Sequence, residues 1–180
     1  NGRPVLLIQY LTGADRSVFK ITAASIGANA TNNGLSTPRP VDLDGNGTVD
    51  IVYAGDLRGN LWKFDVSSKV PTGNWGVAFG GSPLYISKDK TGSPQPITSA
   101  PNVRSNKSVG GMMVVFGTGR NVFDVYRIDR TSVQTVYSIL DETKYTLDTA
   151  TGNENKVKAI TSPAPTTVSE RTSATAYGDL

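Results

Sequence analysis

The chain has 180 residues, enough for one domain of ordinary size, and its 19 Gly, 10 Pro and 37% hydrophobic residues favour a turn-rich all-β fold. It has no Cys and no His, which excludes disulfides, thiolate metal sites and a Ser-His-Asp triad. The net charge of +3 is too small to indicate nucleic-acid binding, and no apolar run reaches the ~18 residues that a membrane span needs.

Apolar runs and alternating patterns predict β-strands from the N-terminus onward. Residues 5–11 predict a buried strand, and residues 17–23 alternate with the period of two that a returning strand requires. Residues 25–40 are small and polar and contain Pro, so they predict a long loop. Two further strands are expected at 50–56 and 60–66, joined by the turn Asp56-Leu57-Arg58-Gly59.

The second half of the chain predicts fewer and shorter elements. A short strand is expected at 84–87, while the Pro-rich residues 92–103 allow at most an edge strand at Ile97–Thr98. Residues 111–120 and 135–142 predict strong strands. From residue 143 onward we expect a loop-rich tail, with one further strand at 156–162 and a loop or frayed end after it.

A short acidic segment, DLDGNGTVD, precedes the strand at 50–56. Oxygen-bearing groups recur at alternate positions of this segment: Asp42, Asp44, Asn46, Thr48 (through its backbone carbonyl) and Asp50. Calcium needs about six to eight oxygen ligands, which a short segment supplies only by curling around the ion. Gly45 and Gly47 permit the backbone angles of such a curl. The segment therefore predicts a calcium site with these five ligands.

The spacing differs from that of a helix-flanked EF-hand, which places a bidentate Glu at its twelfth position. Here that position is Tyr53, inside the apolar run IVYAG, so we expect Asp50 to close the shell as the bidentate ligand. The alternatives are a different ion and a plain polar turn, because Asp, Asn and Gly favour turns without any ion. Three carboxylates at this spacing repel one another when no cation is bound, which favours the calcium site.

A weak internal repeat suggests a β-propeller. Residues 5–23, 50–66 and 112–125 share an apolar strand, a Gly-rich turn and a second strand with an aromatic residue. Propeller blades contain about 40–50 residues, so this chain supplies roughly three to four of them. We expect either part of a larger propeller or an open assembly of sheets with exposed edges.

Four segments together resemble the C-terminal β-propeller of the PilY/PilC family of type IV pilus biogenesis factors. In the family's order, they are PVDLDGNGTVDIVYAGDLRGNLWKFDVS, PQPITSAPNV, VVFGTGR and QTVYSILD, within roughly residues 40–142. Taken alone, VYAGDLRGNLWKFD also looks like a generic quinoprotein propeller repeat. The resemblance implies an all-β fold, a partial quinoprotein-like β-propeller of three to four blades. Residues 1–180 would then be a single fragment of a larger propeller domain, with the calcium loop at 42–50 and the tail at 143–180.

The resemblance also implies a function: a calcium-binding, non-catalytic module whose calcium occupancy regulates pilus extension and retraction. Carried over to this sequence, the metal ligands are Asp42, Asp44, Asn46, the Thr48 carbonyl and Asp50. The implied partners are pilus components (pilins or minor pilins) and a host cell surface, since several family members are adhesins. The chain lacks an Arg-Gly-Asp tripeptide and the von Willebrand-like region of longer members.

The implied location is extracytoplasmic, at the bacterial outer membrane, the pilus tip or the cell surface. The chain has neither an initiator Met nor a signal-peptide pattern, which indicates a fragment or a processed piece. The missing signal therefore does not argue against this location.

Two other functions are kept as alternatives. A quinoprotein-like dehydrogenase fragment would need a ring of blades and a catalytic base, and the acids near the loop are all assigned to the ion. A calcium-dependent host-binding adhesin module overlaps with the pilus function. Asp124, Asp129 and Asp141 are too scattered for paired catalytic carboxylates, and FGTGR lacks the Lys-Ser/Thr ending of a phosphate loop. We therefore expect no enzymatic activity.

Two aromatic residues, Trp62 and Phe64, share one face of the strand at 60–66. A ligand platform is one interpretation, but core packing between blades is the more common role of such residues. Trp75 follows Thr72-Gly73-Asn74, which faintly resembles the tryptophan-docking signature of quinoprotein blades. A loop Trp without such a role is the alternative.

Overall fold

The computed structural model describes residues 4–9, 16–23, 33–67, 75–106, 111–120, 132–148, 156–161 and 163–172. The strands of these ranges are β1 (Val5–Gln9), β2 (Val18–Thr22), β3 (Arg39–Val41), β4 (Ile51–Gly55), β5 (Asn60–Asp65), β6 (Gly76–Val77), β7 (Tyr85–Ile86), β8 (Asn102–Ser105), β9 (Met112–Gly117), β10 (Thr135–Asp141), β11 (Lys144–Asp148), β12 (Lys156–Thr161) and β13 (Thr166–Thr172). A single 3-10 turn, η1 (Phe79–Gly81), follows β6. Within these ranges the structure contains no helix that could span a bilayer.

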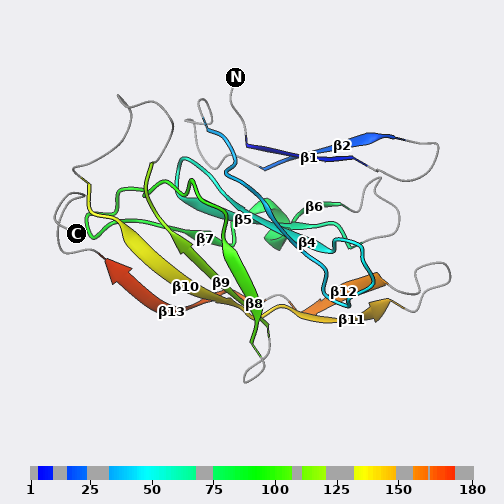
Figure 1. The fold of residues 1–180 in the computed structure, drawn as a ribbon. Coiled ribbons are helices and arrows are strands. Elements are labelled where there is room, and N and C mark those ends of the chain that lie inside the picture. The colour runs from blue at the N-terminus through cyan, green and yellow to red at the C-terminus, as the bar shows by residue number, and fades with distance from the viewer. Residues whose placement is uncertain are drawn as a thin grey trace.

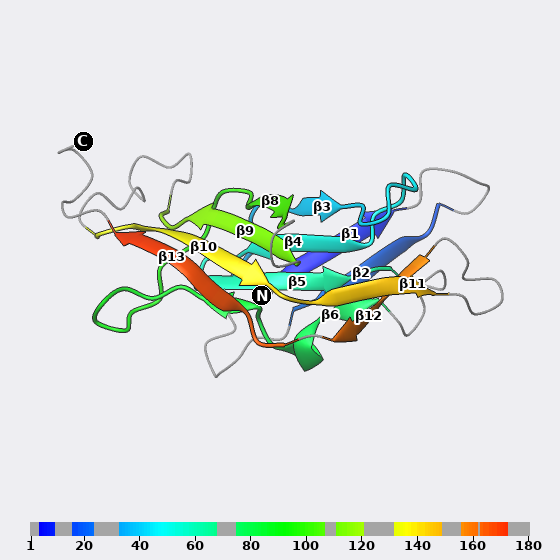
Figure 2. The ribbon, with the colours of Figure 1, turned by 90° about the horizontal axis from the view of Figure 1, so that it is seen from below.

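The sheets stack in layers around β4 and β5 (Figure 1). The central sheet has the order β3-β4-β5-β6, with β7 paired to β5 beyond this path. The β1-β2 hairpin lies on one side of it, and the sheet β13-β10-β9-β8 lies on the other. The β11-β12 hairpin forms its own two-stranded sheet, and β11 continues the course of β10 across the end of the central sheet (Figure 2).

The central sheet is buried on both faces, because successive side chains of a strand point to opposite sides. Tyr53 and Leu61 face the β8-β9-β10 side, where they pack with Val114 and Ile139. On the opposite face, apolar side chains pack against the β1-β2 hairpin: Val52, Ala54, Trp62 and Phe64. All five residues of β4 are buried. The described residues therefore form two apolar clusters, one on each side of this sheet.

The turn between β4 and β5 requires a glycine. Gly59 has a φ of 78°, and a Cβ at this position would lie 2.6 Å from the Gln95 carbonyl oxygen and 2.8 Å from that of Ser87. These two carbonyls belong to the segment that follows β7 and lies along the end of the hairpin. The tight turn therefore holds residues 84–97 against the central sheet.

The structure confirms most of the strands that the sequence predicts, as β1, β2, β4, β5, β7, β9, β10 and β12. The expectation that the first strand is buried is wrong, because Leu7 is 63% exposed. The reason is that β1 belongs to a two-stranded sheet whose outer face is not covered by the described residues.

Several segments expected to be irregular contain strands. Arg39–Val41 forms β3 at the end of the predicted long loop, and Asn102–Ser105 forms β8 at the end of the Pro-rich segment. Ile97 makes only an isolated bridge to Gly119, which matches the expectation of a minimal edge strand. The loop-rich tail expected at 143–180 contains β11, β12 and β13, because β13 finds a partner in β10 and β11 pairs with β12.

The internal repeat is present in part. Its first two copies are the hairpins β1-β2 and β4-β5. In the third copy, β9 pairs with β8 and β10, and the expected second strand at 121–125 lies outside the described residues. The sheets within the described ranges are open, with no closure into a barrel.

Candidate metal site and the buried interface beside it

The acidic segment forms the loop between β3 and β4, as the hairpin register Val41↔Ile51 shows. Within the loop, Asp42, Asp44 and Asp50 each direct a carboxylate oxygen to one place, and these oxygens lie within 4.8 Å of one another. Asp42 and Asp44 are exposed, whereas Asp50 is buried at the start of β4. The donor set is made only of oxygen, which is the set that a hard divalent cation prefers.

Backbone N–H groups support the exposed end of the loop. Asp42 accepts hydrogen bonds from the Gly45 amide (2.8 Å) and the Gly47 amide (2.7 Å). The hydrogen bond from Gly47 is the main reason why the pKa of Asp42 lies below its ordinary value, although partial desolvation opposes it. Gly45 and Gly47 both have positive φ, as the sequence predicts for such a curl. These backbone donors favour the ionised form of Asp42.

The buried end of the loop is tied to the sheet through Asp50. Its backbone N–H donates to the Val41 carbonyl at 2.9 Å, and its carbonyl accepts from the Val66 amide at 2.8 Å. The Leu43 amide donates to Asp50 Oδ2 at 2.8 Å. The backbone of Asp50 is therefore held by Val41 of β3 and by Val66, which follows β5, and its carboxylate by the Leu43 amide, while the other two carboxylates lie on the solvent side.

The two remaining predicted ligands take part in hydrogen bonds within the loop. Asn46 Oδ1 accepts from the Thr48 amide at 2.8 Å and from the Thr48 hydroxyl at 2.5 Å, and Asn46 Nδ2 donates to Asp44 Oδ2 at 2.9 Å. The structure thus brings the three predicted carboxylates together, and Asn46 is hydrogen-bonded to one of them. The metal-binding roles of all five stay predictions.

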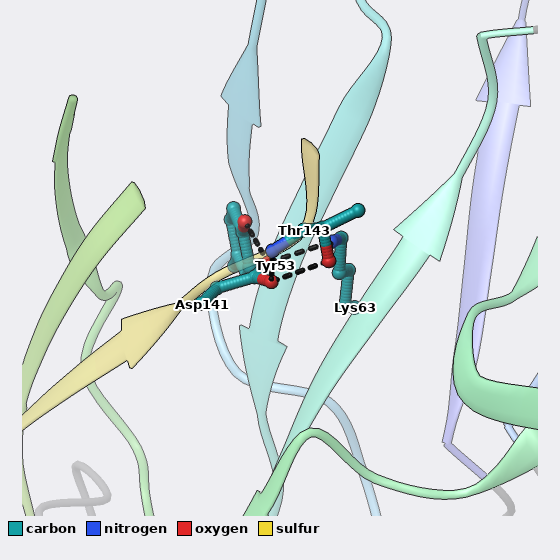
Figure 3. Close-up of polar contacts among 4 residues, drawn as sticks. All are labelled: Tyr53, Lys63, Asp141 and Thr143. Carbon is teal, nitrogen blue, oxygen red and sulfur yellow. Dashed lines mark hydrogen bonds and ion pairs between the residues drawn. The ribbon is translucent and has the colours of Figure 1, made fainter. Parts of the chain in front are cut away.

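A buried polar network joins β4 and β5 to the end of β10 (Figure 3). The Lys63 ammonium lies 2.6 Å from Asp141 Oδ2, and the side chains are 2% and 1% exposed. The Tyr53 hydroxyl donates to the same oxygen at 2.7 Å, and the Thr143 hydroxyl donates to Asp141 Oδ1 at 2.6 Å. Lys63 also donates to the Thr143 hydroxyl at 2.7 Å. Tyr53 and Lys63 are cross-strand partners, so one hairpin presents both groups to Asp141.

The pKa shifts in this network reflect burial and pairing together. Burial alone would raise the pKa of Asp141, but the Lys63 ammonium and the hydrogen bonds from Thr143 and Tyr53 hold it below its ordinary value. Burial lowers the pKa of Lys63, and the charges of Asp141 and Asp65 oppose this shift. Burial and the nearby Asp141 raise the pKa of Tyr53, so it stays a neutral hydrogen-bond donor. The network is an ion pair held by hydroxyl donors.

Aromatic rings cover the Lys63 ammonium. Its nitrogen lies 5.2 Å from the ring centroid of Phe79 and 5.2 Å from that of Tyr145. Such contacts stabilise a desolvated cation by about 2 kcal/mol. Tyr145 belongs to β11, so the β5 lysine is held between η1 on one side and the β10-β11 segment on the other.

A third buried carboxylate, Asp56, organises the turn at the other end of the β4-β5 hairpin. Its Oδ2 accepts from Trp62 Nε1 (2.7 Å), Asn33 Nδ2 (2.9 Å) and Asn60 Nδ2 (2.8 Å). Its Oδ1 accepts from the backbone amides of Arg58 and Asn60. Asp56 is fully buried. These bonds indicate a structural role for Asp56, at the hairpin end opposite the acidic loop.

Sequence reasoning did not single out the Lys63–Asp141 network. One signal was present, because Lys63 alternates with Leu61 on the face that turned out to be buried. A lysine at an inward-facing strand position requires an anionic partner. The partner could not be found, because Asp141 lies far beyond Lys63 in the sequence, on a strand of another sheet.

The structure also places the other candidate residues that the sequence indicates. Trp62 and Phe64 are buried in the cluster against the β1-β2 hairpin, which confirms core packing. Trp75 makes an edge contact with Phe19 of β2, with 5.3 Å between the ring centroids. Asp124 and Asp129 lie outside the described residues.

Comparison with known proteins gives a consistent result. The model of the PilY1 β-propeller domain family matches residues 3–160. The type IV pilus biogenesis factor PilY1 of Pseudomonas aeruginosa strain PAO1 is 36% identical over 77% of this chain, and a PilY1 homolog of Xylella fastidiosa is 37% identical over 78%. The crystal structure of the P. aeruginosa PilY1 C-terminal domain is similar over 69% of this chain, with 35% identity and a TM-score of 0.59.

The match covers a limited part of these relatives. The chain spans 13% of the P. aeruginosa protein, 10% of the X. fastidiosa protein and 28% of the solved C-terminal domain. The family model nevertheless matches most of this chain, and the fold of open antiparallel sheets agrees with it. The chain therefore belongs to the PilY1 β-propeller domain family.

Proposed function

We propose that the loop at 42–50 binds calcium. The observation that carries this proposal is the convergence of three carboxylates within 4.8 Å on a hairpin loop of a PilY1-family domain. Asp42 and Asp44 can be reached from solvent, and Asp50 is held by Val41 of β3, by Val66 and by the Leu43 amide. Asn46 and the Thr48 carbonyl would complete the shell after the loop's internal hydrogen bonds rearrange. Three carboxylates on one short loop suggest a Kd of about 10⁻⁷–10⁻³ M.

The proposed module is part of a type IV pilus biogenesis factor, located outside the cytoplasm at the outer membrane, pilus tip or cell surface. Calcium would neutralise the acidic loop and order its exposed end on the β3-β4 hairpin. A pilus component, such as a pilin or minor pilin, would then distinguish the filled loop from the empty one. In this way calcium occupancy would regulate pilus extension and retraction. The relatives' names support the pilus context and do not identify the partner.

The chain would be one fragment of a larger propeller. The outer faces of the stack support this, because Leu7 of β1 is 63% exposed and Val136 of β10 is 52% exposed. The equivalent faces of the central sheet are covered on both sides. A Val136→Cys variant should react with a thiol reagent more slowly in the full-length protein than in the 180-residue chain. Equal rates would contradict a neighbouring blade on this face.

Titration calorimetry tests the calcium proposal directly. The metal-free protein should bind one calcium ion, and Asp42→Ala and Asp50→Ala should each abolish or strongly weaken binding. Asp89→Ala is a matched control, because Asp89 also holds a tight turn through its carboxylate but lies outside the cluster. In bacteria, Asp50→Ala should change pilus extension or retraction, whereas Asp89→Ala should not. A flat titration of the unaltered protein would remove the proposal.

We infer that the module is not catalytic. The acids of the loop are assigned to the ion, and the buried Asp141 is engaged by Lys63, Tyr53 and Thr143. An absorbance scan after addition of pyrroloquinoline quinone tests this inference. A calcium-dependent quinone spectrum would argue for a dehydrogenase fragment instead.

A further inference from the structure

We propose that calcium binding at the loop and the docking of β10-β11 on the central sheet are one coupled equilibrium, with Leu43 and Tyr145 as the positioning residues. This inference rests on the proposed calcium site and adds how its occupancy is transmitted into the fold. It predicts that residues that provide no ligand atom set the calcium affinity.

Leu43 connects the loop to the interface. It lies between the ligands Asp42 and Asp44, and its amide donates to Asp50 Oδ2 at 2.8 Å. Its side chain packs against the apolar cluster that contains Ile51, Tyr53 of β4 and Ile139 of β10. A change in the path of the loop therefore moves a side chain that rests on the contact between the two sheets.

Tyr145 connects the same cluster to the ion pair. Its ring packs against the cluster from β11 and lies 5.2 Å from the Lys63 ammonium. Lys63 in turn is paired with Asp141 at the end of β10. The loop and the β10-β11 segment thus meet on one set of buried side chains, although they are far apart in the sequence.

A bound ion would hold the ligands on either side of Leu43, so the loop would keep the Leu43 side chain on the apolar cluster that it shares with Tyr145. Occupancy should therefore stabilise the docked position of β10-β11.

Coupling of this kind is reciprocal: whatever stabilises the docked interface must raise the calcium affinity by the same factor. Typical couplings change affinity by about 5- to 150-fold. Leu43→Ala keeps the backbone N–H bond to Asp50 but removes the packing, and Tyr145→Leu removes the ring over Lys63. Each should weaken calcium binding by roughly 5-fold or more with one ion still bound at saturation.

Three control variants separate coupling from general destabilisation. Val49→Ala lies in the same loop, but Val49 is exposed, and Leu147→Ala lies on β11, where Leu147 is exposed. Ile21→Ala weakens the other apolar cluster, on the far face of the central sheet. All three should bind calcium like the unaltered protein. Tyr145→Phe, which keeps the ring, should restore the affinity lost in Tyr145→Leu.

Hydrogen exchange of the full protein with and without calcium, read by mass spectrometry, gives the second measurement. Calcium should slow exchange in peptides from 135–148 as well as in the loop, and Leu43→Ala should lose the distant effect at saturating calcium. Calcium binding with protection confined to 39–66, or an unchanged Kd in folded Leu43→Ala and Tyr145→Leu, overturns the inference but leaves the calcium site intact. A protein that binds no calcium removes the proposed site, and the coupling with it.

Discussion

Lys63 of β5 and Asp141 of β10 form a 2.6 Å ion pair across the boundary between two sheets, where water has almost no access to either group. Removing charges from water is costly, and the cost is recovered only when every partner is in place. Here Tyr53 and Thr143 donate to the carboxylate, and Thr143 also accepts from the ammonium. The pair therefore fixes how the sheets are positioned relative to each other more than it adds net stability.

Lys63→Met should lower the free energy of unfolding by about 3–5 kcal/mol, because it leaves the Asp141 carboxylate buried without its cation. The double variant Lys63→Met/Asp141→Leu should recover much of this loss, since it removes both charges. Lys20→Met is the control, because Lys20 is an exposed strand lysine of β2. Denaturant unfolding measures all four proteins. A loss below 1 kcal/mol in Lys63→Met would contradict the buried pair.

The loss of folding stability at low pH should depend on Asp141. Its pKa in the folded protein lies below the ordinary 3.8, so the stabilisation is fully present above pH 3.8 and is lost as the pH falls through the lower folded-state pKa. Asp141→Asn should be less stable than the unaltered protein at pH 7, and the difference should shrink below pH 3.8. Thermal unfolding across this range measures the effect. A constant difference would show that Asp141 is not ionised in the fold.

Gly59→Ala and Gly45→Ala separate backbone strain from steric overlap, because both glycines have a φ of 78°. At Gly45 no atom lies within 4 Å of the added Cβ, so only the left-handed conformation is penalised, by about 1–2 kcal/mol. At Gly59 the Cβ would overlap the Gln95 and Ser87 carbonyls, which adds roughly 1–3 kcal/mol. Denaturant unfolding in the presence of a chelator measures the loss of stability in both variants. Equal losses would refute the close approach at Gly59.

Trp62→Phe should cost about 1.5–3 kcal/mol beyond the loss of packing, because Trp62 Nε1 donates to the buried Asp56 carboxylate at 2.7 Å. In an Asp56→Asn background the same substitution should cost less, since the charged acceptor is gone. A double-mutant cycle by denaturant unfolding gives the coupling directly. Additive losses would mean that this hydrogen bond contributes little.

Calcium should stabilise the fold by mass action if the proposed site exists. At a free calcium concentration of 100 times the Kd, the free energy of unfolding should rise by about 2.7 kcal/mol, and a chelator should reverse the gain. Asp50→Ala should show no calcium response. Thermal scans with calcium, with chelator and with magnesium provide the test. A rise in Tm that persists in Asp50→Ala would place the ion elsewhere.

Much of the fold could be predicted, because its central hairpin obeys local rules. The apolar runs of β4 and β5 flank a turn that ends in glycine, and both strands lie where the pattern places them. The strands that were missed depend on partners: β13 is polar and forms because β10 offers an edge, and β8 follows a segment rich in Pro. Such strands are selected by tertiary pairing and leave little trace in local sequence.

The candidate site, like the fold, could be predicted only in part. The grouping of Asp42, Asp44 and Asp50 follows from alternate positions on one short loop, so the spacing alone predicts it. The Lys63–Asp141 pair and its link through Leu43 and Tyr145 depend on how two sheets pack, and no local spacing encodes that. Sequence reasoning therefore found the loop but not the interface against which it rests.

Pro40 occupies the middle of β3, the outermost strand of the central sheet on the side of the acidic loop. Proline has no N–H to donate to an incoming chain, so this edge of the sheet is a poor template for a strand of another chain. The acidic loop can therefore remain exposed without the neighbouring backbone seeding aggregation between copies. A partner that binds this corner of the molecule would have to recognise side chains and charge, because it could not add a strand to the sheet here.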